Sequence, residues 1–206
     1  MTAEPEKDRS ISGLETTSPE PIPAASDLPE SKIEAARQAR LDGDAAFESG
    51  NIDGARACYQ AAISADPKNI RAHHNLAAVY LTADQPDEAR NVLQASLEQF
   101  PDDAELHYNL GVANVRLETP ERAISAFEHA LSLDPDHLDA RFQIALLHAR
   151  GAAPASRDRE HAIEALEQIL ETTQRGVPYE NLDRVCFLLA SFLDDFTDQT
   201  KRAIEV

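Results

Sequence analysis

The 206-residue sequence predicts an all-α fold built from repeated pairs of helices. Three observations support this prediction. Hydrophobic residues make up 42% of the chain but aromatic residues only 5%, a mixture that suits closely packed helices better than stacked sheets. From Lys32 onward, apolar residues recur at helical spacing. The same stretch repeats with a constant period of about 34 residues, a length that fits a unit of two helices.

The period is set by prolines and small residues in fixed places. Pro67, Pro101 and Pro135 follow one another at this interval. The same interval separates Ala55, Ala89 and Ala123, then Ala62, Ser96 and Ala130, and then Ile63, Leu97 and Leu131. A proline forces the preceding residue away from α geometry, so each of the three prolines should end a second helix. The small residues Gly43, Ala77 and Gly111 should let the two helices of a pair approach closely.

This pattern resembles the tetratricopeptide repeat family, most clearly in the second unit. There the family positions are filled by His73, Leu76, Ala77, Tyr80, Ala89, Leu93, Ser96 and Pro101. The resemblance implies a right-handed α-solenoid of stacked antiparallel helix pairs over residues 32–206. It places the repeats at 36–69, 70–103, 104–137 and 138–174, with a partial fifth repeat or capping helices at 179–206. One repeat cannot bury its apolar face alone, so the stack should fold together.

The two ends and the fourth repeat depart from the pattern. Ala162 comes five residues later than the period requires, so 150–157 should be a longer loop between helices. The last residues, 200–206, suggest a second helix that stops early, so the chain is expected to be truncated there or to end in a modified cap. Residues 1–31 are rich in proline, serine and acidic residues and should be disordered. They could form a solubilising tail or carry a short linear motif.

Charge and motifs exclude several classes of function. The net charge of −18 should repel nucleic acid and anionic membrane surfaces. Neither a secretory signal nor an apolar run of spanning length is present, so a cytoplasmic protein without membrane insertion is expected. Cys58 and Cys186 are expected to be small core residues. Adjacent His73 and His74 point about 100° apart on a helix, so we predict no metal site, and we predict no cofactor and no catalytic site.

The family resemblance also implies a concave groove lined by the first helix of each pair. Its candidate partner-binding residues are Arg37, Arg40, Phe47, Arg71, His74, Asn75, Tyr108, Asn109, Val112, Arg116, Phe142, Gln143, Leu146 and Arg150. The basic members gather near the first two repeats and the apolar members near the last two. A client segment with acidic and apolar residues would suit this surface. Alternatively, the charges form a solvated face and the apolar residues pack on neighbouring helices.

Some family members clamp a terminal carboxylate of heat-shock chaperones, and the resemblance aligns Arg40, Asp44, Asn75, Glu105 and Asn109 with the clamp. Only Asn75 matches, and Asp44 and Glu105 would repel a carboxylate, so this activity is not predicted. The predicted function is a non-enzymatic interaction module, meaning a scaffold, adaptor or assembly factor that binds a protein or peptide client. The alternative is a structural protein that self-assembles into a homo-oligomer through the terminal helices carrying Phe187, Phe192 and Phe196.

Overall fold

The computed structural model describes residues 29–149 and 156–192, and within these ranges all regular structure is helical, as the sequence predicts. The helices are α1 (Glu30–Glu48), α2 (Ile52–Ala65), α3 (Ile70–Thr82), α4 (Pro86–Gln99), α5 (Ala104–Arg116), α6 (Pro120–Leu133), α7 (Leu138–Ala149) and α8 (Ser156–Gln174). A further helical segment covers 182–192. No helix in the described ranges is long and apolar enough to cross a membrane.

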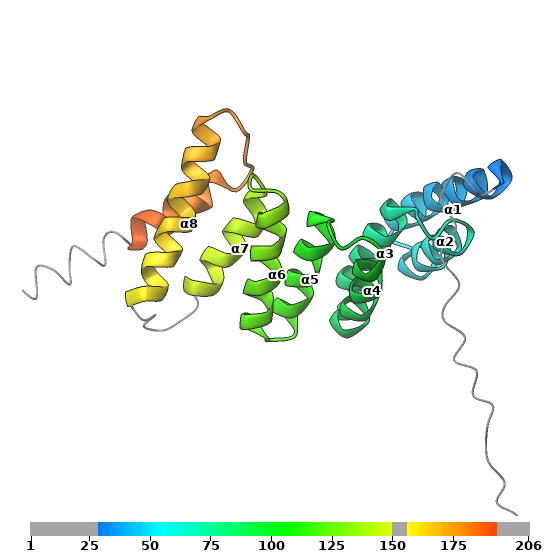
Figure 1. Ribbon diagram of the computed structural model, residues 1–206, viewed down its shortest axis with the longest axis horizontal. Helices are drawn as coiled ribbons and strands as arrows, with labels where there is room; N and C mark the ends of the chain where they lie inside the picture. Colours follow the sequence, from blue (N-terminus) through cyan, green and yellow to red (C-terminus); the bar gives the residue numbers. More distant parts are fainter. Residues whose placement is uncertain (1–28, 150–155, 193–206) are drawn as a thin grey trace, which may run out of the picture.

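The helices stack in chain order as an α-solenoid. Each helix from α1 to α7 contacts the next one, and the contacts are densest within the pairs α1–α2, α5–α6 and α7–α8. Figure 1 shows the result as a row that runs from α1 and α2 at one end to α8 and the segment 182–192 at the other. Most of the predicted tail, most of the predicted loop at 150–157, and the last residues, 200–206, lie outside the described residues.

Helix boundaries follow from local sequence chemistry. The second helices α2, α4 and α6 each end two residues before a proline, at Ala65, Gln99 and Leu133. Prolines also open α4 and α6, where a missing backbone N–H costs nothing. The N-cap side chain of Asn69 accepts from Ala72 N at 3.3 Å and starts α3.

In each of the first three helix pairs, a small residue on the first helix is complementary in size to a large residue on the second helix: the smaller the first, the larger the second. A Cβ added to Gly43 would lie 2.6 Å from Cε1 of Tyr59, and one added to Gly111 would lie 2.5 Å from Cδ1 of Phe127. In the second pair the same two places are filled by Ala77 and Leu93, which lie in one buried cluster. Glycine therefore stands opposite an aromatic ring and alanine opposite leucine, because each pair needs one fixed volume at the contact.

The turn between the two helices of a pair has one geometry throughout the first three repeats. Gly50, Asp84 and Glu118 occupy equivalent positions of successive repeats and have positive φ angles of 78°, 55° and 54°. This left-handed conformation ends a first helix without strain only for glycine. Asp84 and Glu118 therefore carry a backbone cost that Gly50 avoids.

The last described helices close the stack. Ala162, Leu166 and Ile169 of α8 are fully buried, so the residues that the sequence places five positions late still reach the core. Val185 of the segment 182–192 is fully buried in the same cluster. The prediction of a buried Cys186 was wrong: this side chain faces solvent on the segment 182–192, and Cys58 is only partly buried.

Candidate functional site

The first helices of the pairs form a continuous inner layer. Besides the contacts between sequence neighbours, α1 contacts α3 and α3 contacts α5. The residues predicted for the groove come from these helices and from α7. The inner surface of α1, α3 and α5 is called the inner face below.

Asp44 of α1 is the centre of a polar network on the inner face. Its carboxylate accepts hydrogen bonds from Arg40 at 2.5 Å, from the Tyr59 hydroxyl at 2.9 Å and from Asn75 Nδ2 at 2.8 Å. Because Asn75 belongs to α3, this network joins the first repeat to the second. Burial, together with the hydrogen bond to Asp44, raises the pKa of Tyr59 well above its usual value.

An open pocket of about 200 Å³ lies beside this network. It is lined by Asp44, Phe47, Glu48, Tyr59, Asn75 and Ala78. Phe47 and Ala78 contribute apolar surface, and Asp44, Tyr59 and Asn75 contribute polar atoms that the Asp44 network already holds in place. Such a mixture of apolar surface and few fixed polar groups is typical of binding pockets. We call it the Asp44 pocket.

Two further contacts join α3 and the turn after it to α5. His74 Nε2 lies 2.9 Å from Oδ1 of Asp103, and the same oxygen accepts from the backbone N of Leu106 at 2.8 Å and caps α5. Arg116 donates to the carbonyl oxygen of Leu81 and lies 3.6 Å from the Asp84 carboxylate. His74 and Arg116 therefore link α3 to α5.

In the third repeat, contacts with neighbouring side chains hold the carboxylate of Glu105 and the ring of Tyr108 in place. Glu105 accepts from Asn109 at 3.3 Å and lies 3.6 Å from His137 Nε2. The close contact with His137 lowers the pKa of Glu105, and the same contact raises the pKa of His137. The Tyr108 ring centre lies 4.6 Å from that of His137, and burial raises the pKa of Tyr108 to about 12.

At the fourth repeat, the segment 182–192 covers the predicted apolar residues. Phe142 is only 3% exposed, and the Arg184 guanidinium lies 5.3 Å from the centre of its ring. Leu146 packs against the same cluster, Gln143 and Val112 are partly buried, and Arg150 lies outside the described residues. A pocket of about 250 Å³ remains between Phe142, Leu146, Asp183, Arg184, Phe187 and Leu188.

Most of the predicted cations of the groove lie beside carboxylates. Arg37 pairs with Glu34 at 3.3 Å, and Arg40, His74 and Arg116 are paired as described above. Arg71 is exposed and forms no ion pair within the part of the chain that the structure describes. The prediction of a basic groove rests on the number of cations and leaves out their acidic partners. The i, i+3 spacing of Glu34 and Arg37 and the i, i+4 spacing of Arg40 and Asp44 already indicate these ion pairs in the sequence.

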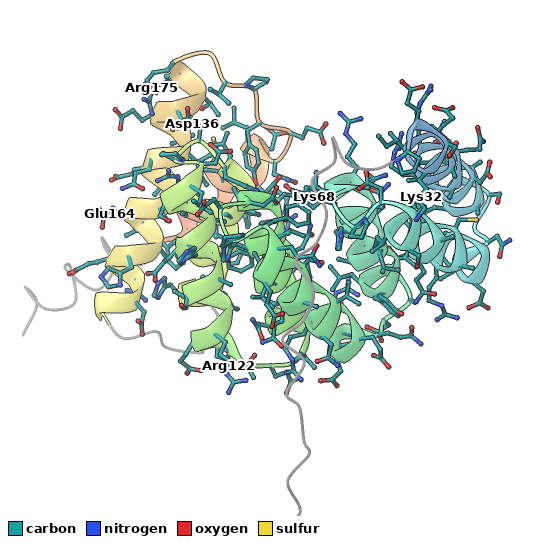
Figure 2. The ribbon with its side chains drawn as sticks, turned by 45° about the vertical axis from the view of Figure 1, so that its right-hand side comes forward. Lys32, Lys68, Arg122, Asp136, Glu164 and Arg175 are labelled. Atoms are coloured by element: carbon teal, nitrogen blue, oxygen red, sulfur yellow. The ribbon has the colours of Figure 1, made fainter. Side chains whose placement is uncertain are left out.

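Other charged side chains lie away from the helix contacts. Figure 2 shows Arg122 of α6 projecting outward from the stack. His73, by contrast, is 4% exposed: its Nε2 donates to the carbonyl oxygen of Pro67 at 2.9 Å, and its Nδ1 lies 2.8 Å from Ser96 Oγ. Burial lowers the pKa of His73, and both ring nitrogens already have protein partners.

The stacked helix pairs define an α-solenoid. Residues 46–110 and 104–137 match models of the tetratricopeptide repeat family. These parts of the chain are therefore tetratricopeptide repeats, as the sequence pattern predicts. No curated protein sequence matches it at a significant level.

Solved structures support the same fold. A MamA fragment from Desulfovibrio magneticus RS-1 is 24% identical with a TM-score of 0.60, over 69% of this chain and 78% of that one. A tetratricopeptide repeat protein from Parabacteroides merdae is 16% identical with a TM-score of 0.64, over 82% and 64%. The first repeat domain of Spaghetti (RPAP3), bound to the HSP90 peptide SRMEEVD, is 22% identical with a TM-score of 0.55, over 59% and 96%. At these identities the similarity concerns the fold.

Proposed function

We propose that this protein is a non-enzymatic interaction module that holds a segment of a client protein along its inner face. The observation that carries the proposal is the Asp44 pocket. Three hydrogen bonds fix the polar groups of Asp44, Tyr59 and Asn75 before any ligand arrives, which reduces the ordering cost of binding. The solved complex of the Spaghetti domain with a peptide supports this mode of binding for the fold.

The pocket also favours a particular kind of segment. An apolar anchor of the client would enter beside Phe47 and Ala78, where the wall is apolar. Arg71 lies one helical turn before Asn75 on α3, so it can pair with an acidic residue next to that anchor. The proposed client segment therefore combines an apolar residue with an acidic neighbour.

A terminal carboxylate is not the proposed ligand of the Asp44 pocket. A carboxylate entering it would meet the charge of Asp44, and Glu105 adds a second negative charge on α5. The pKa of Glu105 is lowered, so this acid stays ionised at neutral pH. The client is accordingly an internal segment, and scaffold or adaptor roles are consistent with it.

The test is a screen of a random peptide display library on the purified chain. We expect enriched peptides that pair an apolar with an acidic residue. Ala78→Arg should fill the pocket and weaken these peptides at least about tenfold, the loss expected when a central contact is removed. Arg71→Glu should remove the preference for the acidic neighbour. Arg122→Glu, on the exposed face of α6, is the matched control and should change nothing.

Ala78→Arg and Arg71→Glu are better probes than truncation of Tyr108 or Phe142. Phe142 is buried and Tyr108 packs against the buried Phe127, so truncating either would damage the fold as well as the surface. Circular dichroism should confirm that each variant keeps its helices. Unchanged peptide binding in both pocket variants would refute the placement of the client on the inner face.

Self-assembly through the C-terminal end is the second candidate function. Phe187 is 76% exposed and stands at the rim of the pocket that also contains Leu146 and Leu188. Large exposed apolar side chains at the end of a solenoid favour stacking on another copy. Light scattering at tens of micromolar should then give a mass above 22.6 kDa that falls to the monomer value in Phe187→Asp. A monomer throughout would exclude this function.

A further inference from the structure

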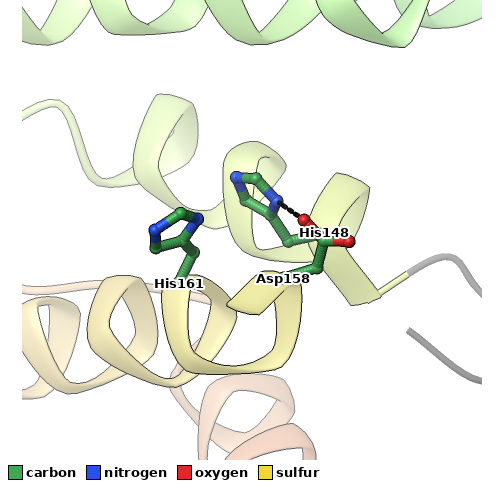
Figure 3. Close-up of side chains that lie close together, drawn as sticks. All are labelled: His148, Asp158 and His161. Carbon is green, nitrogen blue, oxygen red and sulfur yellow. Dashed lines mark ion pairs between the residues drawn. The ribbon is translucent and has the colours of Figure 1, made fainter. Parts of the chain in front are cut away.

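Three side chains with metal-binding chemistry converge where α7 meets α8. His148 lies in the last turn of α7, and Asp158 and His161 lie in the first two turns of α8. One ligand atom from each of the three lies within 4.8 Å of the other two, and the described ranges hold no second such group of three. Figure 3 shows both imidazole rings and the carboxylate gathered at one place between the two helices.

The spacing of these residues is suited to a single ion. Asp158 and His161 are three residues apart, so they share one face of α8. His148 approaches from the neighbouring helix, and its Nδ1 lies 3.5 Å from Oδ1 of Asp158. Ligand atoms around a tetrahedral Zn²⁺ lie about 3.4 Å apart, given metal–ligand distances of about 2.0–2.2 Å. Small side-chain rotations would therefore bring all three groups to bonding distance.

The surroundings leave room for an ion. The side chains of His148 and Asp158 are 18% and 49% exposed, so an ion can reach them from solvent. Both histidines line a pocket of about 240 Å³ together with Glu164, one turn beyond His161 on α8. Arg141 lines the same pocket, but its guanidinium donates to Gln168 and to the carbonyl oxygen of Pro135.

We propose that His148, Asp158 and His161 bind one divalent cation of the Zn²⁺ type and thereby pin α7 to α8. Imidazole ligands select zinc and neighbouring transition metals, whereas Mg²⁺ and Ca²⁺ require sites made of oxygen atoms. Water completes the coordination, because Glu164 is not among the converging ligands and accepts a hydrogen bond from Gln168 at 3.4 Å. The cation fixes the junction in which residues 150–155 connect the two helices. This site is remote from the Asp44 pocket and independent of client binding.

The test is calorimetric titration of the tag-free chain with ZnCl₂. We expect one Zn²⁺ per chain. Asp158→Asn and His161→Gln should each weaken binding by at least about tenfold, because even the loss of an indirect partner of a metal ligand costs about 10–100-fold. Zn²⁺ should raise the melting temperature of the native chain and leave that of His161→Gln unchanged.

The chain contains a matched control. His107 and His129 form a second close pair, with ring centres 4.3 Å apart. His129→Gln should bind Zn²⁺ as the native chain does. On the native chain, Zn²⁺ should also shift the imidazole ¹⁵N resonances of His148 and His161. Equal binding of Mg²⁺, loss of binding in His129→Gln, or unshifted resonances of His148 and His161 would each overturn the proposal.

Discussion

Replacing Gly111 with alanine tests whether helix approach in each pair depends on the match between small and large residues. Alanine in a helix is favoured over glycine by about 1 kcal/mol. The added Cβ would lie 2.5 Å from Cδ1 and 2.8 Å from Cζ of Phe127, whose side chain is fully buried and cannot move aside. Overpacking of this kind costs about 1–3 kcal/mol, and three close ring contacts place the cost near the upper end. The net loss of unfolding free energy should be about 2 kcal/mol.

A double-mutant cycle separates this clash from other effects. Phe127→Leu alone should destabilise the chain, because it removes buried ring atoms. The double variant Gly111→Ala with Phe127→Leu recreates the Ala77–Leu93 pair of the second repeat, so the two changes should couple favourably by about 2 kcal/mol. Urea unfolding followed by circular dichroism measures all three variants. Ala77→Gly, the reverse change in the second repeat, should only destabilise. A more stable Gly111→Ala chain, or additive effects in the cycle, would refute the reasoning.

Two further predictions concern a turn and an ion pair. Glu118→Gly should raise the melting temperature and stabilise the chain by about 0.5–1 kcal/mol. A φ of 54° costs a non-glycine residue about 1–2 kcal/mol, and the greater loss of backbone entropy on folding of glycine offsets part of the gain. A lower melting temperature would contradict the strain at this turn. The raised pKa of His137 gives stability that is complete below its ordinary value of 6.5 and is lost as pH rises through the raised value. The lowered pKa of Glu105 gives stability that is complete above 4.5 and is lost as pH falls through the lowered value. Glu105→Gln should therefore reduce the melting temperature most between pH 4.5 and 6.5, and an equal reduction at about pH 9 would exclude the ion pair as the cause.

The fold could be predicted because its information is local and repeated. A constant repeat length, with proline and glycine or alanine in fixed places, specifies helix ends and helix approach without any knowledge of distant contacts. The site could be predicted only as a set of positions. The i, i+4 spacing indicates that Arg40 can pair with Asp44, but nothing local indicates that Tyr59 and Asn75 bind the same carboxylate from other helices.

The C-terminal end shows the same limit. Nothing in the pattern around Phe142 indicates that the segment 182–192 covers it, because that contact joins residues that are distant in the sequence. His148 and His161 lie on either side of the lengthened connection, so no fixed ligand spacing reveals that they converge. Exposure of Cys186 likewise depends on which face of the last described helical segment meets the core.

The small residue and the large residue of each helix pair have to be inherited together. This requirement limits which segments of the gene can be exchanged between repeats, and it concerns Gly43 with Tyr59, Ala77 with Leu93, and Gly111 with Phe127. A crossover between the second repeat and either of its neighbours, placed in the turn between the two helices of a pair, would join a glycine to a leucine or an alanine to an aromatic ring, leaving a void or a clash. A crossover after a second helix moves both members together. Exchange of whole repeats therefore keeps every match, whereas single helices of the second repeat cannot be exchanged with those of its neighbours.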